Sequence, residues 1–205
     1  MKNKIDYSIY LVTDRSVLGG RDLYKVIEEA ILGGATLVQL REKDISSLEF
    51  YNIALRVKKV TDKYNIPLII NDRIDVALAV DAAGVHVGQT DFPCIVTRKL
   101  IGENKILGIS ASTLTEALKA QDEGADYIGV GAMFPTETKL DAALVNMDTL
   151  KNIKRVIGIP VVAIGGINEN NFIKLYDAGI DGVAVISAIL GKSDIKAATE
   201  KFKKD

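Results

Sequence analysis

Short apolar runs alternate with segments of helical spacing along the chain. The runs are four or five residues long and rich in Val and Ile, which is typical of strands. They cover residues 9–12, 36–40, 67–70, 84–87, 105–109, 127–130, 161–164 and 183–186. Around them, apolar residues recur every three or four positions, and this spacing predicts helices over residues 23–32, 46–63, 74–80, 95–101, 114–121, 147–156, 171–176 and 194–203.

The continuous apolar character of these runs predicts a parallel sheet covered on both faces, because a half-exposed strand would alternate apolar and polar residues. Eight strand–helix units in 205 residues predict a single (β/α)8 TIM barrel, an α/β fold that spans residues 1–205 as one domain. The alternative is an open doubly wound sheet. That fold usually carries a glycine-rich turn after its first strand, and here the chain reads Val-Thr-Asp-Arg. We therefore favour the barrel.

The composition excludes several classes of protein. Apolar residues make up 48% and charged residues 26% of the chain, and the formal net charge is -1. This balance lacks the broad basic surface of a nucleic-acid binder. The apolar runs fall short of the roughly 20 residues of a membrane helix, and the N-terminal residues do not resemble a signal peptide. A single cysteine, Cys94, cannot form an internal disulfide, so we expect a cytoplasmic protein.

In a TIM barrel, the side chains just past the strand C-termini face one shared bowl, so these positions hold the candidate site. After the second run, strand alternation would turn Gln39, Arg41 and Lys43 to one side. An amide and two cations on one face favour an anion such as a phosphate, which Arg grips as a fork. In the alternative interpretation, Arg41 and Lys43 pair with Glu42 and Asp44 on a solvated surface.

Carboxylates follow the third and fourth runs. Asn71 and Asp72 come directly after the third run, and Asp91 lies in the loop after the fourth. Two carboxylates at neighbouring strand ends would repel each other unless a cation lay between them, and Mg²⁺ commonly takes one or two carboxylates together with substrate phosphate oxygens. The alternative is that Asp72 and Asp91 cap the helices that begin near Arg73 and beyond Pro93.

Phosphate-binding features follow the last three runs. The loop after the sixth run reads Pro-Thr-Glu-Thr-Lys, which offers two hydroxyls and a cation, although it could also be a solvated turn. The seventh and eighth runs end in Gly-Gly and Ile-Ser. In phosphate-binding barrels these two ends hold the phosphate through backbone amides and a helix N-terminus, where glycine permits close approach. The candidate residues are Thr136, Thr138, Lys139, Gly166, Ile186 and Ser187.

Nucleophilic catalysis has weak support in this sequence. Ser110 follows the fifth run, but the sequence offers it no convincing His–Asp pair, so a hydrolase triad is not expected. His86 lies inside the fourth run, where a histidine is more often a satisfied core residue than a catalyst. Nothing near Cys94 suggests an activated thiolate. We expect Ser110 to bind substrate through a hydrogen bond.

Two anion sites follow from these positions. The cations and aspartates near the second to fourth runs, with Lys139, suit a diphosphate and Mg²⁺. The hydroxyls and glycines at the last three runs suit a monophosphate. A diphosphate is a leaving group, whereas a monophosphate ester serves to hold a substrate. The two sites together predict transfer of an organic group from its diphosphate to a phosphorylated acceptor.

Eight sequence blocks resemble the thiamine-phosphate synthase family, in order and over nearly the whole chain. They are YLVTD, VQLREKD, INDRIDVALAV, GVHVGQTDFP, GISAST, GADYIGVGAMFPTETK, PVVAIGGI and DGVAVISAI. The resemblance implies a TIM barrel that joins hydroxymethylpyrimidine diphosphate to a thiazole phosphate, or its carboxylated form. The products would be thiamine monophosphate and diphosphate, formed by a dissociative, Mg²⁺-assisted substitution.

The resemblance also implies residue roles. The pyrimidine diphosphate would be held by Gln39, Arg41, Lys43, Asn71, Ser110 and Lys139. Of these, the catalytic residues would be Arg41, Lys43, Ser110 and Lys139. The metal Mg²⁺ would be bound by Asp72 and Asp91. The thiazole phosphate would be contacted by Thr136, Thr138, Gly166, Ile186 and Ser187.

Other functions fit parts of the sequence. The related thiazole tautomerase shares the barrel but needs neither diphosphate nor metal, so the retained Arg41, Lys43, Asp72 and Asp91 favour the synthase. A non-catalytic phosphate-binding protein would not need paired carboxylates. A sugar-phosphate isomerase needs a facing acid and base, which we cannot nominate. The expected partners are small phosphorylated molecules, with no nucleic acid and no membrane, and a homo-oligomer is compatible with the sequence.

Overall fold

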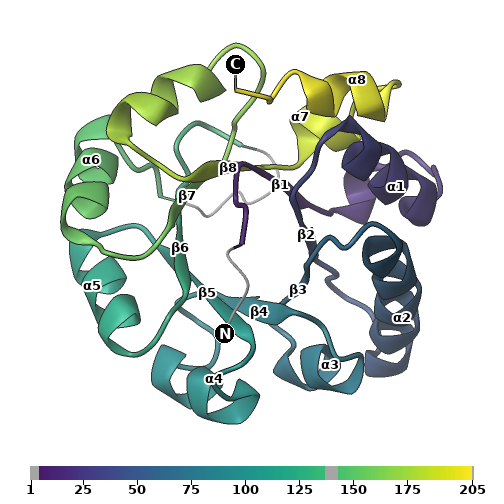
Figure 1. The fold of residues 1–205 in the computed structure, drawn as a ribbon, viewed down its shortest axis with the longest axis horizontal. Coiled ribbons are helices and arrows are strands. Elements are labelled where there is room, and N and C mark those ends of the chain that lie inside the picture. The colour runs from purple at the N-terminus through teal and green to yellow at the C-terminus, as the bar shows by residue number, and fades with distance from the viewer. Residues whose placement is uncertain (1–4, 137–142, 205) are drawn as a thin grey trace.

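The computed structural model describes residues 5–136 and 143–204, and within them the apolar runs form a closed barrel of eight parallel strands (Figure 1). The strands are β1 Ile9–Val12, β2 Leu37–Leu40, β3 Leu68–Asn71, β4 Gly84–Val87, β5 Ile106–Ala111, β6 Tyr127–Val130, β7 Val161–Ile164 and β8 Gly182–Val185. Each strand pairs with its sequence neighbours, and β1 pairs with β8 to close the ring. The predicted TIM barrel is confirmed.

Helices surround the barrel as an outer layer (Figure 1). They are α1 Leu23–Gly33, α2 Ser47–Lys63, α3 Ile74–Ala79, α4 Cys94–Ile101, α5 Leu114–Asp122, α6 Met147–Val156, α7 Ser187–Leu190 and α8 Ile195–Glu200, with 3-10 helices η1 Arg15–Val17 and η2 Phe172–Ala178. The segment predicted as a helix over residues 171–176 is thus a 3-10 helix. Asn171 is its N-cap residue but makes no side-chain cap, because its Oδ1 accepts from the Asn168 amide (2.8 Å) while its Nδ2 donates to the Gly166 carbonyl (3.0 Å). Among the described helices, none has the length and apolar character needed to cross a membrane.

Local sequence signals explain where several helices begin and end. Asp22 caps α1 by accepting hydrogen bonds from the first-turn amides, and Ser46 caps α2 in the same way. Thr113 and Glu116 form a reciprocal capping box at α5. Gly34 ends α1 with φ 114°, a left-handed conformation that glycine adopts without steric cost.

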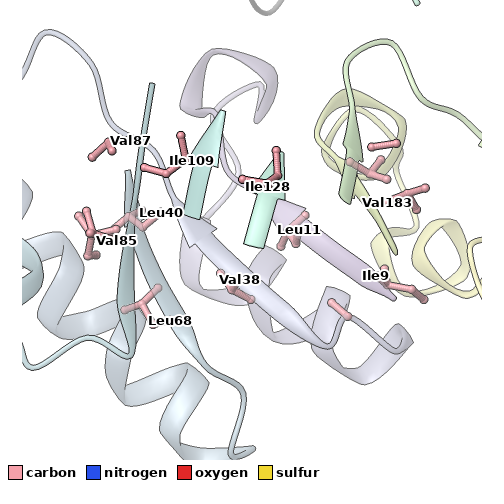
Figure 2. Close-up of a cluster of buried hydrophobic side chains, with 14 of the residues drawn as sticks. Ile9, Leu11, Val38, Leu40, Leu68, Val85, Val87, Ile109, Ile128 and Val183 are labelled. Atoms are coloured by element: carbon pink, nitrogen blue, oxygen red, sulfur yellow. The ribbon is translucent and has the colours of Figure 1, made fainter. Parts of the chain in front are cut away.

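The apolar core has two layers. The outer layer lies between strands and helices and gathers strand residues such as Leu11, Val38 and Ile128, all fully or almost fully buried (Figure 2). The inner layer fills the barrel and includes Tyr10 and Tyr127, which are also fully buried. Because successive strand residues point to opposite faces, one strand supplies both layers, which explains why the runs are continuously apolar.

A glycine makes room for the largest inner side chain. Gly108 on β5 lies against the ring of Tyr127, and a Cβ at this position would overlap the ring carbons and hydroxyl. The tyrosine ring also packs on Tyr7, with ring centroids 5.0 Å apart, and on His86, at 5.5 Å. The interior of the barrel is therefore filled by aromatic side chains whose polar atoms need hydrogen-bond partners.

Candidate active site

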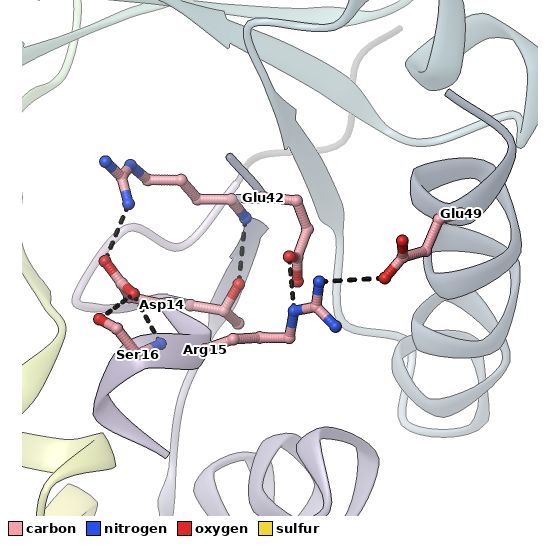
Figure 3. A network of polar contacts seen from close by, with 7 residues as sticks. Asp14, Arg15, Ser16, Glu42 and Glu49 are labelled. Atoms are coloured by element: carbon pink, nitrogen blue, oxygen red, sulfur yellow. Dashed lines mark hydrogen bonds and ion pairs between the residues drawn. The ribbon is translucent and has the colours of Figure 1, made fainter. Parts of the chain in front are cut away.

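The end of β2 places Arg41 against the loop after β1. Its guanidinium donates to Asp14 Oδ2 (2.8 Å), and its backbone amide donates to the Thr13 hydroxyl (3.0 Å). Asp14 also accepts hydrogen bonds from the backbone amide and hydroxyl of Ser16, so its carboxylate is held in place (Figure 3). The β1 loop therefore orients the cation that the sequence assigns to phosphate binding.

The neighbouring Glu42 faces away from Arg41. Its carboxylate pairs with Arg15 Nε (2.7 Å), and Arg15 also reaches Glu49 on α2 (3.2 Å; Figure 3). Burial raises the pKa of Glu42, against the effect of the Arg15 charge. Within the described residues, its Oε1 is a buried side-chain oxygen without a hydrogen-bond partner. The alternative in which Arg41 pairs with Glu42 on a solvated surface is therefore wrong.

Lys43 lies beside the predicted metal ligands. Its ammonium contacts Asp72 Oδ2 at 2.6 Å, and Asp91 accepts a hydrogen bond from the Gly88 amide at 2.8 Å. Burial raises the pKa of Asp91, and the nearby Asp72 carboxylate adds to this rise against the hydrogen bond from Gly88. The two carboxylates thus lie close enough to repel each other, as the sequence predicts.

Neither aspartate caps a helix. The N-cap residue of α3 is Arg73 and that of α4 is Pro93, and both caps lack a side-chain hydrogen bond. Asp72 instead adopts φ 60°, a left-handed conformation that is uncommon outside glycine and that turns the chain sharply after β3. The capping interpretation of Asp72 and Asp91 is therefore wrong, since Asp72 pairs with Lys43 and Asp91 accepts from the Gly88 amide.

The donor set fits magnesium shared with a substrate. The described residues contain no group of three or more His, Cys, Asp or Glu side chains that could hold a metal ion, so a dedicated protein cage is not present among them. Mg²⁺ does not need one, because it commonly keeps several waters and binds one or two carboxylates plus phosphate oxygens. Asp72 and Asp91 would be that pair, next to the Lys43 ammonium.

Polar side chains inside the barrel form a continuous hydrogen-bonded chain. Gln39 Nε2 donates to the Tyr10 hydroxyl (2.8 Å), which bonds the Tyr127 hydroxyl (2.8 Å). That hydroxyl bonds His86 Nδ1 (2.9 Å), and His86 Nε2 bonds Ser110 Oγ (2.9 Å). Asn71, at the end of β3, is in register with His86 on β4 and is also buried. The structure therefore brings the predicted pyrimidine-binding residues Gln39, Asn71 and Ser110 to neighbouring positions on the inner face.

The Ser110–His86 contact was missed by sequence reasoning. The available signal was strand register, since His86 pairs with Gly108 across β4 and β5, and Ser110 lies two residues further on the same face. The absence of a hydrolase triad still holds for this pair. The other histidine nitrogen meets the Tyr127 phenol, whereas a triad needs a carboxylate at that position.

The β7 loop packs directly against the β6 loop. Gly165 and Gly166 have φ 97° and 63°, and a Cβ on Gly166 would meet the carbonyl oxygens of Phe134 and Pro135. The Phe134 amide donates to the Gly165 carbonyl at 3.0 Å. Glycine is thus required for an approach that brings the backbone after β7 alongside the segment leading to Thr136.

The remaining predicted phosphate contacts are only partly described. Ile186 follows β8 directly, and Ser187 begins α7, which is only four residues long. Thr138 and Lys139 lie outside the described residues, so the structure neither supports nor contradicts the roles assigned to them. The structure therefore gathers the end of β8 and the β7 loop at the same edge of the barrel.

A family model described as "Thiamine monophosphate synthase" matches residues 9–189. The chain belongs to this family. It is 64% identical to a thiamine-phosphate synthase from Clostridium tetani, over 98% of this chain and 97% of the relative. It is 63% identical to one from Alkaliphilus oremlandii, over 97% and 95% of the two chains. The function of the family, and of this chain, is that of a thiamine-phosphate synthase, an alkyl or aryl transferase of thiamine biosynthesis.

Solved structures agree with this family assignment. A thiamine phosphate pyrophosphorylase from Pyrococcus furiosus is 41% identical, with a TM-score of 0.89 over 96% of this chain and 94% of the other. A geranylgeranylglyceryl phosphate synthase from Thermoplasma acidophilum has a TM-score of 0.68 at 15% identity, over 97% and 92% of the two chains. This second likeness shows the shared barrel fold alone.

Proposed function

We propose that the open end of this barrel joins hydroxymethylpyrimidine diphosphate to a thiazole phosphate, giving thiamine monophosphate and diphosphate. The observation that carries the proposal is the pairing of two close carboxylates with two cations at neighbouring strand ends. Asp72 and Asp91 supply oxygen ligands for Mg²⁺, while Arg41 and Lys43 supply positive charge for a diphosphate. A monophosphate alone would not require both the metal ligands and the cations.

In this proposal, Gln39, Asn71 and Ser110 bind the pyrimidine ring. Gln39 and Asn71 are buried and Ser110 is partly exposed at the end of β5, which suits recognition of a flat polar ring by hydrogen bonds. Arg41, Lys43 and, by family resemblance, Lys139 hold the diphosphate. Arg41 is presented by Asp14, and Lys43 can turn from Asp72 to a phosphate oxygen once a metal ion neutralises the aspartate.

The acceptor would lie at the opposite side of the same opening. Gly166 exposes backbone beside the β6 loop, and Ile186 and Ser187 provide the neighbouring strand end. The hydroxyls of Thr136 and Thr138 would complete the contacts to the thiazole phosphate, as the family resemblance implies. Placing the acceptor against the departing group can contribute roughly 7–11 kcal/mol in favourable cases.

The chemistry we propose is dissociative. The bond between the pyrimidine methylene carbon and the diphosphate oxygen breaks, and its electron pair leaves with the diphosphate. Arg41 and Lys43 stabilise the charge that develops there. Bound Mg²⁺ would supply further neutralisation of the leaving group. The lone pair of the thiazole nitrogen then forms the new carbon–nitrogen bond, so no covalent protein nucleophile is needed.

A chelation experiment tests the reaction and the metal together. Purified protein is mixed with both substrates and Mg²⁺, and thiamine phosphate and diphosphate are followed with and without EDTA. We expect the two products in equal amounts, lost with EDTA and restored by excess Mg²⁺. Isomerisation of the thiazole carboxylate phosphate without diphosphate release would instead indicate a tautomerase. Ligand binding without turnover would indicate a binding protein.

We further propose that this enzyme works in the cytoplasm on small phosphorylated molecules, and a homo-oligomer is compatible with its sequence. Thiamine precursors that carry phosphate groups are charged and stay inside the cell, which supports a cytoplasmic site of action. Light scattering coupled to gel filtration at micromolar concentration would test the oligomeric state. A mass equal to one chain would exclude the homo-oligomer.

A further inference from the structure

The hydrogen-bonded chain from Gln39 to Ser110 crosses the barrel interior, from β2 through β1, β6 and β4 to β5. We call it the interior relay; its five residues are Gln39, Tyr10, Tyr127, His86 and Ser110. Its four hydrogen bonds are 2.8 to 2.9 Å long. Both tyrosines are fully buried, so their hydroxyls exchange hydrogen bonds with protein groups rather than with bulk water.

With the Gln39 amide nitrogen facing Tyr10, the available protons give the relay one direction. Burial raises the pKa of Tyr10 and Tyr127 above its ordinary value, so each phenol keeps one proton to donate. Because the Gln39 amide nitrogen only donates, Tyr10 accepts from it and donates onward to Tyr127. In its neutral form, His86 would accept from Tyr127 at Nδ1 and point its Nε2 proton to Ser110 Oγ. The Ser110 hydroxyl proton is left for a ligand.

Reversing the direction of donation along the relay would change what both Gln39 and Ser110 offer to a ligand. If Gln39 turned its amide oxygen to Tyr10, each hydroxyl would donate the other way, and His86 would carry its proton on Nδ1. Its Nε2 would then accept from the Ser110 hydroxyl, and Ser110 would offer a ligand only lone pairs. Gln39 would at the same time turn its amino group to the ligand. In either direction, one end offers a donor while the other offers an acceptor.

We propose that Tyr10, Tyr127 and His86 couple Gln39 to Ser110, so that the two ends always present opposite hydrogen-bonding character to the bound ring. This inference rests on the proposed function, because it takes Gln39 and Ser110 as contacts of the pyrimidine. An aminopyrimidine edge carries a donor amino group next to an acceptor ring nitrogen, and it matches the relay. A ring edge with two acceptors would leave one end of the relay without a hydrogen-bond partner. Tyr10 and Tyr127 are therefore positioning residues that determine which ring edge is preferred.

The first test reads the relay without any substrate. The chain has a single histidine, so ¹⁵N-histidine labelling gives the tautomer of His86 directly by NMR. We expect Nε2 to carry the proton in the wild type. At mildly alkaline pH, Gln39→Glu should move the proton to Nδ1, because a carboxylate can only accept from Tyr10. Tyr10→Phe should weaken the preference of His86 for one tautomer. Tyr10 does not contact His86 itself, so this effect would have to pass through the Tyr127 hydroxyl.

Tyr7→Phe is the matched control. Tyr7 is buried and packs against the ring of Tyr127, but its hydroxyl is not part of the relay. A purely structural effect of losing a tyrosine hydroxyl near this ring would appear in Tyr7→Phe as well. Histidine signals that stay the same in both Gln39→Glu and Tyr10→Phe would overturn the proposed coupling. So would equal changes in Tyr7→Phe and Tyr10→Phe.

The second test measures ligand discrimination. We compare the normal pyrimidine diphosphate with an analogue in which methoxy replaces the amino group, so that the edge offers two acceptors. The wild type and Tyr7→Phe should prefer the normal substrate by about tenfold or more in kcat/KM. In Tyr10→Phe, Gln39 can turn independently of Ser110, and the preference should fall to about threefold. An unchanged preference in Tyr10→Phe would contradict the role in specificity.

The two tests separate this inference from the proposed function. The tautomer switch in Gln39→Glu depends on the relay alone. If the switch occurs but the wild type forms no thiamine phosphate, the relay stands and the pyrimidine contacts are overturned. If the wild type forms thiamine phosphate but the tautomer does not respond, the activity stands and the relay is overturned. The KM for the thiazole phosphate should stay the same in Tyr10→Phe.

Discussion

At the scale of single residues, we expect the partner of the Lys43 ammonium to depend on whether a metal ion is bound. Its ammonium lies 2.6 Å from an Asp72 oxygen, where it partly neutralises two close carboxylates. A divalent cation bound by Asp72 and Asp91 would take over that role. Lys43 would then be released toward a phosphate oxygen, so metal binding and diphosphate binding should be cooperative.

The carboxylate pair gives a direct mutational prediction. We expect Asp91→Asn to raise the Mg²⁺ concentration needed for half-maximal activity by about tenfold or more, since losing one ligand charge at a partly buried site costs ~1.4 kcal/mol or more. Asp75→Asn is the control, because Asp75 lies in the first turn of α3, pairs with Arg73 at the start of that helix and is not part of the site. Steady-state rates in an Mg²⁺ titration give the answer. Equal Mg²⁺ requirements in the two variants would refute the metal role of Asp91.

At the scale of elements, the α5 capping box links stability to pH. Burial by itself raises the pKa of Glu116, but hydrogen bonds from Ser112 and Thr113 outweigh it and lower the pKa below 4.5. A carboxylate with a lowered pKa stabilises the fold at pH values above its unfolded pKa. That contribution is lost as the pH falls through the folded pKa.

We therefore expect Glu116→Ala to lower the free energy of unfolding by about 1 kcal/mol at neutral pH, the usual size of a cap. The loss should shrink as the pH falls below 4.5, the ordinary value for this carboxyl. Urea denaturation at several pH values measures both effects. Glu103→Ala, at an exposed loop position, serves as the control and should have little effect. A loss that is independent of pH would count against the capping account.

Strand positions and strand-end chemistry were predictable because both depend on local pattern. The apolar runs located the barrel strands, and the residues after them included Arg41, Lys43, Asp72 and Asp91. The partners of these residues were not predictable. The Arg41–Asp14 pair depends on how the loop after β1 meets the end of β2, and the hydrogen bond from Asn171 to Gly166 likewise joins groups whose contact the local pattern does not indicate.

The interior relay was beyond sequence reasoning for a different reason. Tyr10 and Tyr127 are separated by 117 positions in the chain, and they meet only because β1 and β6 belong to the same closed barrel. Their positions in apolar runs mark them as buried but not as hydrogen-bonded to each other. Predicting such a pair requires the diameter of the barrel and the register of its strands.

At the scale of the whole molecule, the barrel interior has room for the Tyr127 ring because Gly108, which lies against it, has no side chain. We expect Gly108→Ala to destabilise the protein by about 1–3 kcal/mol, because the new methyl group would overlap the Tyr127 ring. Gly158→Ala is the matched control, since its nearest neighbour would be a Gln121 side-chain oxygen at an ordinary 3.6 Å. Thermal unfolding compares the two. Similar melting temperatures for both variants would show that the interior can shift to accept the methyl group.

The division of the core into an outer and an inner layer has a consequence for how this protein can change over evolutionary time. Outer residues such as Val38 and Ile128 pack within a cluster of apolar side chains, so neighbouring positions there can exchange volume in pairs. Inner residues such as Tyr10 and Tyr127 pack the barrel and also carry the hydrogen bonds of the proposed relay. Drift should therefore accumulate beneath the helices, while the barrel interior stays nearly fixed for as long as the same ring must be recognised.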